Sequence, residues 1–112
     1  AVVARAPDLA GIFGANLFSA IGSADGVKAM GKSGEIKVVA FDAPTRIVDD
    51  LKSGLVDMAI AQHPAEIGYM GVMVAFGHVT GNPVPVSVGT GFTVMTADNI
   101  DDPDISKYVY SD

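Results

Sequence analysis

The chain has 112 residues, which suits one small domain. It is 49% hydrophobic and 18% charged, so it has enough apolar sequence to bury a core. The formal net charge of -6 and the scattered positions of the seven Lys and Arg residues disfavour a nucleic-acid partner. Cysteine is absent, which excludes disulfide and thiol chemistry. No uninterrupted apolar run reaches about 18 residues, so we expect no membrane span.

The first third of the chain alternates a short apolar run with helix-like sequence. Residues 1–6 are predicted to be the tail of a helix, and Pro7-Asp8 breaks it. A short buried strand is predicted over residues 9–14. Asn16 then suits the N-cap of a helix, because its side chain can accept from the free amides of the first turn. Apolar residues recur after it with the helical period as far as Gly31.

The rest of the chain continues this alternation. Residues 36–41 are predicted as a strand whose nearly continuous apolar sequence is typical of a parallel strand covered on both faces. Asp42-Ala-Pro44 opens a second helix, with the proline near the first turn, where its missing amide costs least. A strand, a helix, a loop and a last strand follow at residues 55–61, 64–80, 81–85 and 91–96. The last fifteen residues hold five Asp and one Lys, and we expect an exposed, partly mobile tail.

The order of these elements predicts an α/β fold. Connections of this length allow right-handed crossovers between parallel strands, which gives a three-layer arrangement. Three of the apolar strands end in a polar side chain that can hydrogen-bond a hydroxyl group, namely Asn16, Asp42 and Gln62. Because a helix follows each strand, these side chains are expected at the carboxyl edge of the sheet, where open α/β sheets bind ligands. Two amides and one carboxylate form a compact set for a polyhydroxylated ligand.

Among these residues, Asp42 is the strongest candidate for a ligand contact. A carboxylate can accept from two neighbouring hydroxyls through charge-assisted hydrogen bonds. Asn16 and Gln62 can donate and accept at once, which suits a hydroxyl that does the same. The alternative is that Asn16 and Asp42 only cap the helices that follow them, and one residue can serve both purposes. Phe13 and Phe41 lie within strands and are expected in the core rather than stacked on a sugar ring.

Five segments of the chain occur in an order and spacing that is hard to reach by chance. They are Ile12-Phe13-Gly14-Ala15-Asn16, Gly31-Lys32, Val38-Val39-Ala40-Phe41-Asp42, Ser53-Gly54 and Ala59-Ile60-Ala61-Gln62. In these segments the chain resembles the periplasmic sugar-binding proteins of the ribose-binding type, which are the solute receptors of ABC importers. The resemblance covers roughly residues 7–100. The chain departs from the family at Leu17, where many members have Asp.

The resemblance also implies how the chain is divided. In this family two similar lobes face each other across a cleft, and the chain crosses between them three times. Residues 1–62 would then form βα units of the second lobe, residues 63–82 a helix that belongs to the other lobe, and residues 83–112 the returning strand and the acidic tail. We therefore expect the chain to be a C-terminal fragment of a two-lobe protein of roughly 300 residues. The signal peptide of such a protein would lie outside it.

The helix expected at residues 64–80 is surrounded almost completely by apolar side chains, and such a helix must be buried. We therefore expect the fragment to associate with itself through this helix, in a symmetric or segment-swapped dimer. The alternative is that the helix folds back onto the lone lobe.

The function implied by the resemblance is the sugar-like solute-binding component of an ABC import system. Such a protein is periplasmic or otherwise extracytoplasmic, with a small sugar-like solute and the ABC permease as partners. The effector-binding domain of a sugar-responsive LacI-type repressor shares this fold and is the alternative.

Other chemistries find little support in the sequence. A phosphoacceptor role for Asp42 is disfavoured because Gly14-Ala15-Asn16 offers no acidic pair. His63 and His78 are too few and too far apart for a metal site. No nucleophile stands beside a plausible base, so we expect neither an enzyme nor a cofactor.

Overall fold

The structure is a computed structural model that describes residues 2–111, without the side chains of Val2 and Val3. It contains two compact units. The first unit consists of Ala1–Ala61 together with Thr93–Asp112, and the second consists of Gln62–Phe92.

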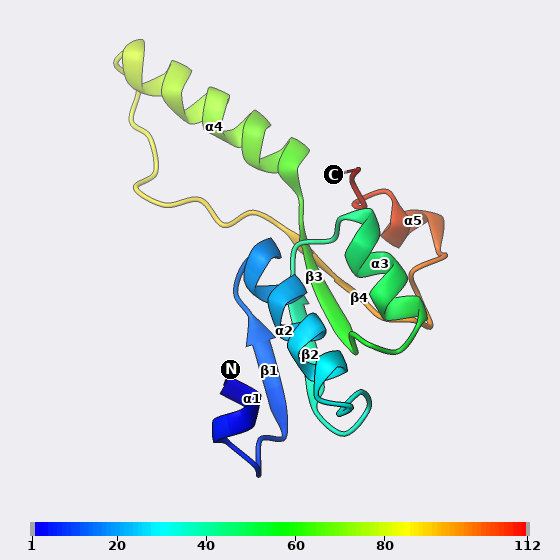
Figure 1. Ribbon diagram of the computed structural model, residues 1–112. Helices are drawn as coiled ribbons and strands as arrows, with labels where there is room; N and C mark the ends of the chain where they lie inside the picture. Colours follow the sequence, from blue (N-terminus) through cyan, green and yellow to red (C-terminus); the bar gives the residue numbers. More distant parts are fainter. Residues whose placement is uncertain (1, 112) are drawn as a thin grey trace. The chain divides into compact units, whose positions relative to one another are not determined.

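The first unit is built on a four-stranded sheet with the strand order β1-β2-β3-β4 (Figure 1). β1 runs parallel to β2, and β2 runs parallel to β3. The predicted alternation of strands and helices is confirmed, although each of the four strands begins later than expected. The strands are β1 (Gly11–Gly14), β2 (Lys37–Phe41), β3 (Met58–Gln62) and β4 (Phe92–Met95).

The helices of the first unit are α1 (Val2–Arg5), α2 (Leu17–Ala29), α3 (Thr45–Lys52) and α5 (Pro103–Ser106). Helices α2 and α3 connect successive parallel strands and lie on the same face of the sheet (Figure 1). When successive right-handed crossovers proceed in one direction along a sheet, their helices lie on the same face. The core lies between these helices and the sheet, and includes Ala24, Val27, Val38, Ala40, Ile47, Leu51, Ala59 and Met95.

The opposite face of the sheet is less covered by the described residues. Phe13 is 55% exposed, whereas Phe41 is half-buried. The prediction of a core position is therefore wrong for Phe13, and so is the prediction of a buried strand at residues 9–14. The reason is that β1 is an edge strand and that Phe13 alternates along it with Gly14, which faces Ala20 of α2, so that Phe13 lies on the opposite face of the sheet. An apolar run alone does not distinguish such an edge strand from a central one.

The acidic tail is packed more closely than its composition predicts. Ile100 is only 2% exposed, and Tyr108 and Val109 pack against the core. Asp102 caps α5 by accepting a hydrogen bond from the Asp104 amide at 2.8 Å. The expectation of an exposed, partly mobile tail is therefore wrong for its apolar residues, which turn toward the core, although most of the polar ones between them are exposed.

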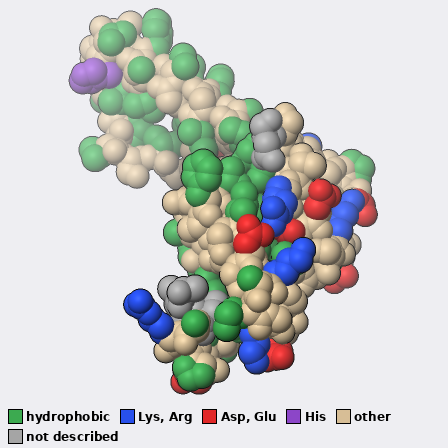
Figure 2. Space-filling view, viewed as in Figure 1, with side chains coloured by type: hydrophobic (Ala, Val, Ile, Leu, Met, Phe, Trp, Pro, Cys, Tyr) green, Lys and Arg blue, Asp and Glu red, His purple; other side chains and the backbone are tan. Residues whose placement is uncertain are grey.

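The second unit consists mainly of the 16-residue helix α4 (Pro64–Val79) and an extended segment that follows it. No residue of α4 is buried, although the helix is apolar on nearly every side. Figure 2 shows hydrophobic side chains over this helix. The most exposed of the large ones are Tyr69, Val72, Met73, Phe76 and Val79. The expectation that a further surface buries α4 stays a prediction. Within residues 2–111, no helix combines the length and apolar character needed to cross a bilayer.

Candidate ligand-binding site

The strand register brings two of the three predicted site residues to the same edge of the sheet. Gly14 of β1 lies beside Ala40 of β2 in the parallel pair. Asn16 and Asp42 each follow two residues later, so both positions lie just beyond the carboxyl ends of neighbouring strands. This is the edge at which open parallel sheets bind ligands.

Asn16 is the N-cap of α2, as predicted. Its Oδ1 accepts a hydrogen bond from the backbone amide of Ser19 at 2.9 Å, and the Ser19 hydroxyl accepts one from the backbone amide of Asn16 at 3.1 Å. These two bonds form a capping box, which satisfies otherwise unpaired amides at the helix start. The Asn16 Nδ2 group takes no part in these capping bonds. Since the side chain is exposed, its two N–H donors are available to a ligand.

Asp42 has the one positive φ angle among the described residues other than glycine, at 78°. Its amide donates to the Ile60 carbonyl at 2.9 Å, which joins the end of β2 to β3. A left-handed backbone at such a residue costs about 1–3 kcal/mol and is found preferentially at functional sites. Asp42 is not the N-cap of α3, because Pro44 occupies that position. The alternative in which Asp42 serves only as a cap is therefore wrong.

The loop after Asp42 is held by a segment that the sequence did not indicate as part of the site. The Tyr110 amide donates to the Ala43 carbonyl at 3.3 Å, and the Thr45 amide donates to the Tyr110 carbonyl at 3.2 Å. Ala43 and Pro44 are fully buried. The signal that could have revealed this contact is the apolar content of residues 108–110, which the neighbouring aspartates obscured.

Gln62, the third predicted site residue, is the last residue of β3 and is exposed. It is also the first residue of the second unit. The Ile60 position two residues earlier pairs with Phe41, which precedes Asp42. That Gln62 acts together with Asn16 and Asp42 stays a prediction.

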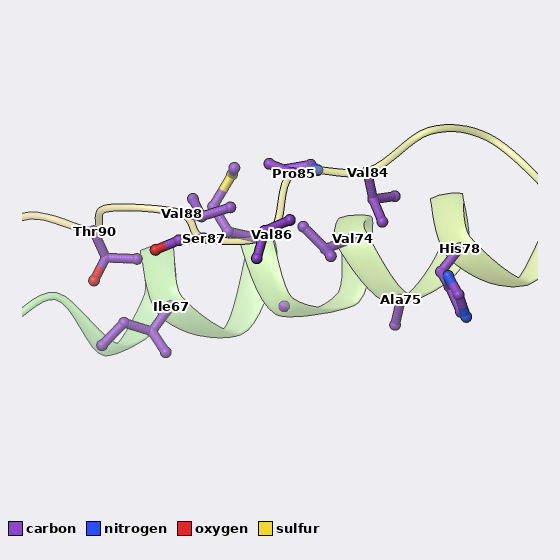
Figure 3. Close-up of a pocket in the computed structure, with 12 residues that line it drawn as sticks. Ile67, Val74, Ala75, His78, Val84, Pro85, Val86, Ser87, Val88 and Thr90 are labelled. Carbon is purple, nitrogen blue, oxygen red and sulfur yellow. The ribbon is translucent and has the colours of Figure 1, made fainter.

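The second unit carries an apolar groove of about 610 Å³ between α4 and the extended segment (Figure 3). Val74 lies on the helix side of this groove, and Val84 and Val86 lie on the segment side. This lining suits another apolar protein surface better than a sugar, which needs several hydrogen-bonding groups. The lining residues are Ile67, Met70, Gly71, Val74, Ala75, His78, Val84, Pro85, Val86, Ser87, Val88 and Thr90.

Glu66, in the first turn of α4, links this helix to the extended segment of the second unit. Its Oε2 accepts a hydrogen bond from the Gly91 amide at 3.0 Å and lies 3.3 Å from Nδ1 of His63. A β-carbon at Gly91 would collide with the His63 ring, so only glycine fits there without a shift. His63 therefore lies against Glu66 and Gly91 within this unit.

Comparison with known proteins identifies the family. A model of the periplasmic binding protein domain matches residues 1–83. The chain therefore belongs to the periplasmic binding protein family, as its sequence motifs predicted. No protein with a curated description matches the chain.

Solved structures agree with this assignment. An ABC transporter solute-binding protein from Agrobacterium vitis, bound with α-D-tagatopyranose, is 61% identical with a TM-score of 0.89, and the match covers 99% of this chain and 37% of that one. A second protein from Agrobacterium vitis, with bound D-fucose, is 32% identical with a TM-score of 0.83 over 97% of this chain and 38% of that one. A carbohydrate transporter solute-binding protein from Agrobacterium radiobacter, in complex with D-arabinose, is 29% identical with a TM-score of 0.82 over 97% and 37%.

These matches confirm the predicted α/β fold of the periplasmic-binding-protein type. The chain spans little more than a third of each of these relatives. The relatives are sugar-binding transport proteins, and the family is extracytoplasmic.

Proposed function

We propose that this chain is part of the sugar-binding receptor of an ABC import system. The observation that carries the proposal is the 61% identity, over nearly the whole chain, to a solute-binding protein that holds α-D-tagatopyranose. The edge geometry of Asn16 and Asp42 supports it independently, because both residues lie where a parallel sheet binds a ligand.

The proposed site uses complementary hydrogen-bonding groups. The Asp42 carboxylate accepts from two adjacent sugar hydroxyls, and the Asn16 Nδ2 group donates to a hydroxyl oxygen. Gln62 contacts the sugar from the side where the chain leaves the lobe. A sugar that touches both lobes of the full-length receptor shifts its equilibrium from the open to the closed form. By full-length receptor we mean the longer protein of which this chain is proposed to be a part.

A pyranose sugar is the proposed ligand class, with D-tagatose as the first candidate. Three similar folds hold three different sugars, so the fold alone does not select the solute. The receptor is proposed to be periplasmic, to deliver its sugar to an ABC permease, and to catalyse no reaction. The sugar transporters among the similar structures favour this function over that of a LacI-type repressor.

A panel of sugars tests this proposal on the full-length receptor. Thermal unfolding is followed with D-tagatose, D-fucose, D-arabinose and sucrose, each at millimolar concentration. A ligand at about 100 times its Kd stabilises the folded state by about 2.7 kcal/mol, which raises Tm by several degrees. We expect such a rise with at least one pyranose and none with sucrose. A receptor whose Tm responds to no sugar would contradict the proposal.

The 112-residue chain by itself is proposed to associate through α4. Burying its exposed aromatic and aliphatic side chains would contribute roughly 1.5–3 kcal/mol for each fully buried side chain. Light scattering at micromolar concentration should give the mass of a dimer, and Phe76→Glu should give that of a monomer. Lys107→Glu, which also changes the charge but lies on the first unit, is the control. A monodisperse wild-type monomer would overturn this part of the proposal.

A further inference from the structure

The loop that carries Asp42 is fixed from two sides. On one side, the Asp42 amide donates to the Ile60 carbonyl of β3 at 2.9 Å. On the other side, Tyr110 pairs with the loop through two backbone hydrogen bonds, one to the Ala43 carbonyl and one from the Thr45 amide. Pro44 lies between them and has no amide to donate, so these two bonds bracket it.

The segment that contains Tyr110 is itself anchored. Ile100 is buried, and Tyr108 and Val109 pack against the core. Lys52, at the last turn of α3, forms an ion pair of 2.7 Å with Asp101. Thr45, at the first turn of α3, bonds to Tyr110. Residues 100–111 therefore contact α3 at both of its ends (Figure 1).

We propose that residues 100–111 act as a clamp that holds Asp42 in its ligand-binding conformation, with Tyr110 as the positioning residue. The left-handed backbone of Asp42 is unfavourable for an isolated residue and persists only when its surroundings determine it. The hydrogen bonds that Ala43 and Thr45 make with Tyr110 constrain the backbone directly after Asp42. Loosening the clamp lowers the fraction of receptor in which the carboxylate is correctly placed, and the apparent affinity falls with that fraction.

This inference rests on the proposed function, and its test separates the two. The Kd of D-tagatose is measured by calorimetry on the full-length receptor. Tyr110→Pro removes the amide donor and should weaken binding by about tenfold, the loss expected from about one hydrogen bond. Tyr110→Ala keeps the backbone amide and should weaken binding less than Tyr110→Pro. Glu35→Ala is the control outside the clamp and the site, because Glu35 is exposed and pairs only with Lys32 among the ion pairs described. It should bind within about twofold of the wild type.

A double-mutant cycle shows whether the effect passes through Asp42. In the Asp42→Asn background, Tyr110→Pro should change the Kd by no more than about twofold, because the carboxylate it positions is gone. An equal loss in both backgrounds, an unchanged Kd in Tyr110→Pro, or an equal loss in Tyr110→Ala would overturn the clamp. A wild-type receptor that binds no sugar would instead overturn the proposed function.

A second measurement covers the case in which Tyr110→Pro fails to fold. Amide hydrogen exchange is recorded on the wild-type receptor with and without saturating D-tagatose. Binding should slow exchange at the Thr45 and Tyr110 amides by a common factor, since the ligand stabilises the clamped form. Protection that increases elsewhere in the lobe but stays unchanged at these two amides would overturn the clamp.

Discussion

Asn16 and Ser19 exchange hydrogen bonds at the start of α2. The Asn16 Oδ1 accepts a hydrogen bond from the backbone amide of Ser19 at 2.9 Å, and the Ser19 hydroxyl accepts one from the backbone amide of Asn16 at 3.1 Å. The cap therefore uses the oxygen of the Asn16 side chain and leaves its nitrogen to another partner. Capping and ligand contact are assigned to different atoms of one residue, so the two roles can be separated by substitution.

Asn16→Asp in the full-length receptor should keep the fold and weaken sugar binding. The carboxylate can still cap α2, and its charge favours the helix N-terminus by about 0.3–1 kcal/mol. The two N–H donors are lost, so we expect the Kd for D-tagatose to rise by about tenfold. Calorimetry and thermal unfolding measure the two effects.

Ser19→Ala is the matched control for the cap. It should lower the free energy of unfolding by roughly 0.5–1.5 kcal/mol, because one hydrogen bond of the capping box is lost. Its sugar affinity should stay within about twofold of the wild type. If the Kd of Asn16→Asp for D-tagatose equals that of the wild type, Asn16 does not contact the sugar.

The left-handed backbone of Asp42 predicts different effects of two substitutions on stability. Asp42→Gly should have the higher free energy of unfolding of the two, because glycine adopts a positive φ without strain. Asp42→Val should lower it by about 1–3 kcal/mol, because a β-branched residue tolerates this conformation poorly. Chemical denaturation of the two variants checks the sign. A Val variant as stable as the Gly variant would show that the backbone is not constrained.

Gly14 marks the close approach of β1 and α2. A β-carbon there would collide with the backbone of Ala20, which is fully buried. Gly14→Ala should therefore destabilise the fold by about 1–3 kcal/mol through overpacking.

Gly22→Ala is the control for this substitution. Gly22 lies in α2, and a β-carbon there meets no atom within 4 Å. The substitution should stabilise the fold by up to about 1 kcal/mol through helix propensity. Urea denaturation of both variants measures the difference, and a change of the same sign in the two would contradict the packing described for Gly14.

Glu66 is predicted to hold the extended segment of the second unit against α4. Glu66→Ala removes the acceptor of the Gly91 amide, and exchange of that amide should become about tenfold faster for the loss of one hydrogen bond. Thr80→Ala, at the other end of α4, should leave Gly91 unchanged. Equal exchange rates at Gly91 in wild type and Glu66→Ala would show that this hydrogen bond does not hold the segment.

Much of the fold followed from local sequence. The strands and helices around Asn16 and Asp42 were predictable because apolar periodicity and capping residues are encoded within a few positions of each other. Phe13 was misplaced because its exposure depends on what covers β1, and the strand sequence does not contain that information. The tail was misjudged because its aspartates dominate the composition, while Ile100 and Val109 determine how it packs.

The site was predictable only in part. The carboxyl ends of parallel strands meet at one edge of a sheet, so the position of Asn16 and Asp42 at the same edge followed from the predicted topology. The positive φ of Asp42 and the contact of its loop with Tyr110 did not follow, because both depend on residues distant in sequence. Gln62 begins the second unit, and its part in the site still depends on experiment.

The measurement that tests the central claim most directly is calorimetric titration of D-tagatose into the full-length receptor and its Asp42→Asn variant. Asparagine tolerates the left-handed backbone, so the substitution removes the charge and largely preserves the conformation. We predict a measurable Kd for the wild type and a Kd about 10- to 100-fold higher for the variant, as expected for a charge-assisted hydrogen bond. Equal affinities in the two proteins would contradict the account, because Asp42 would then not contact the sugar.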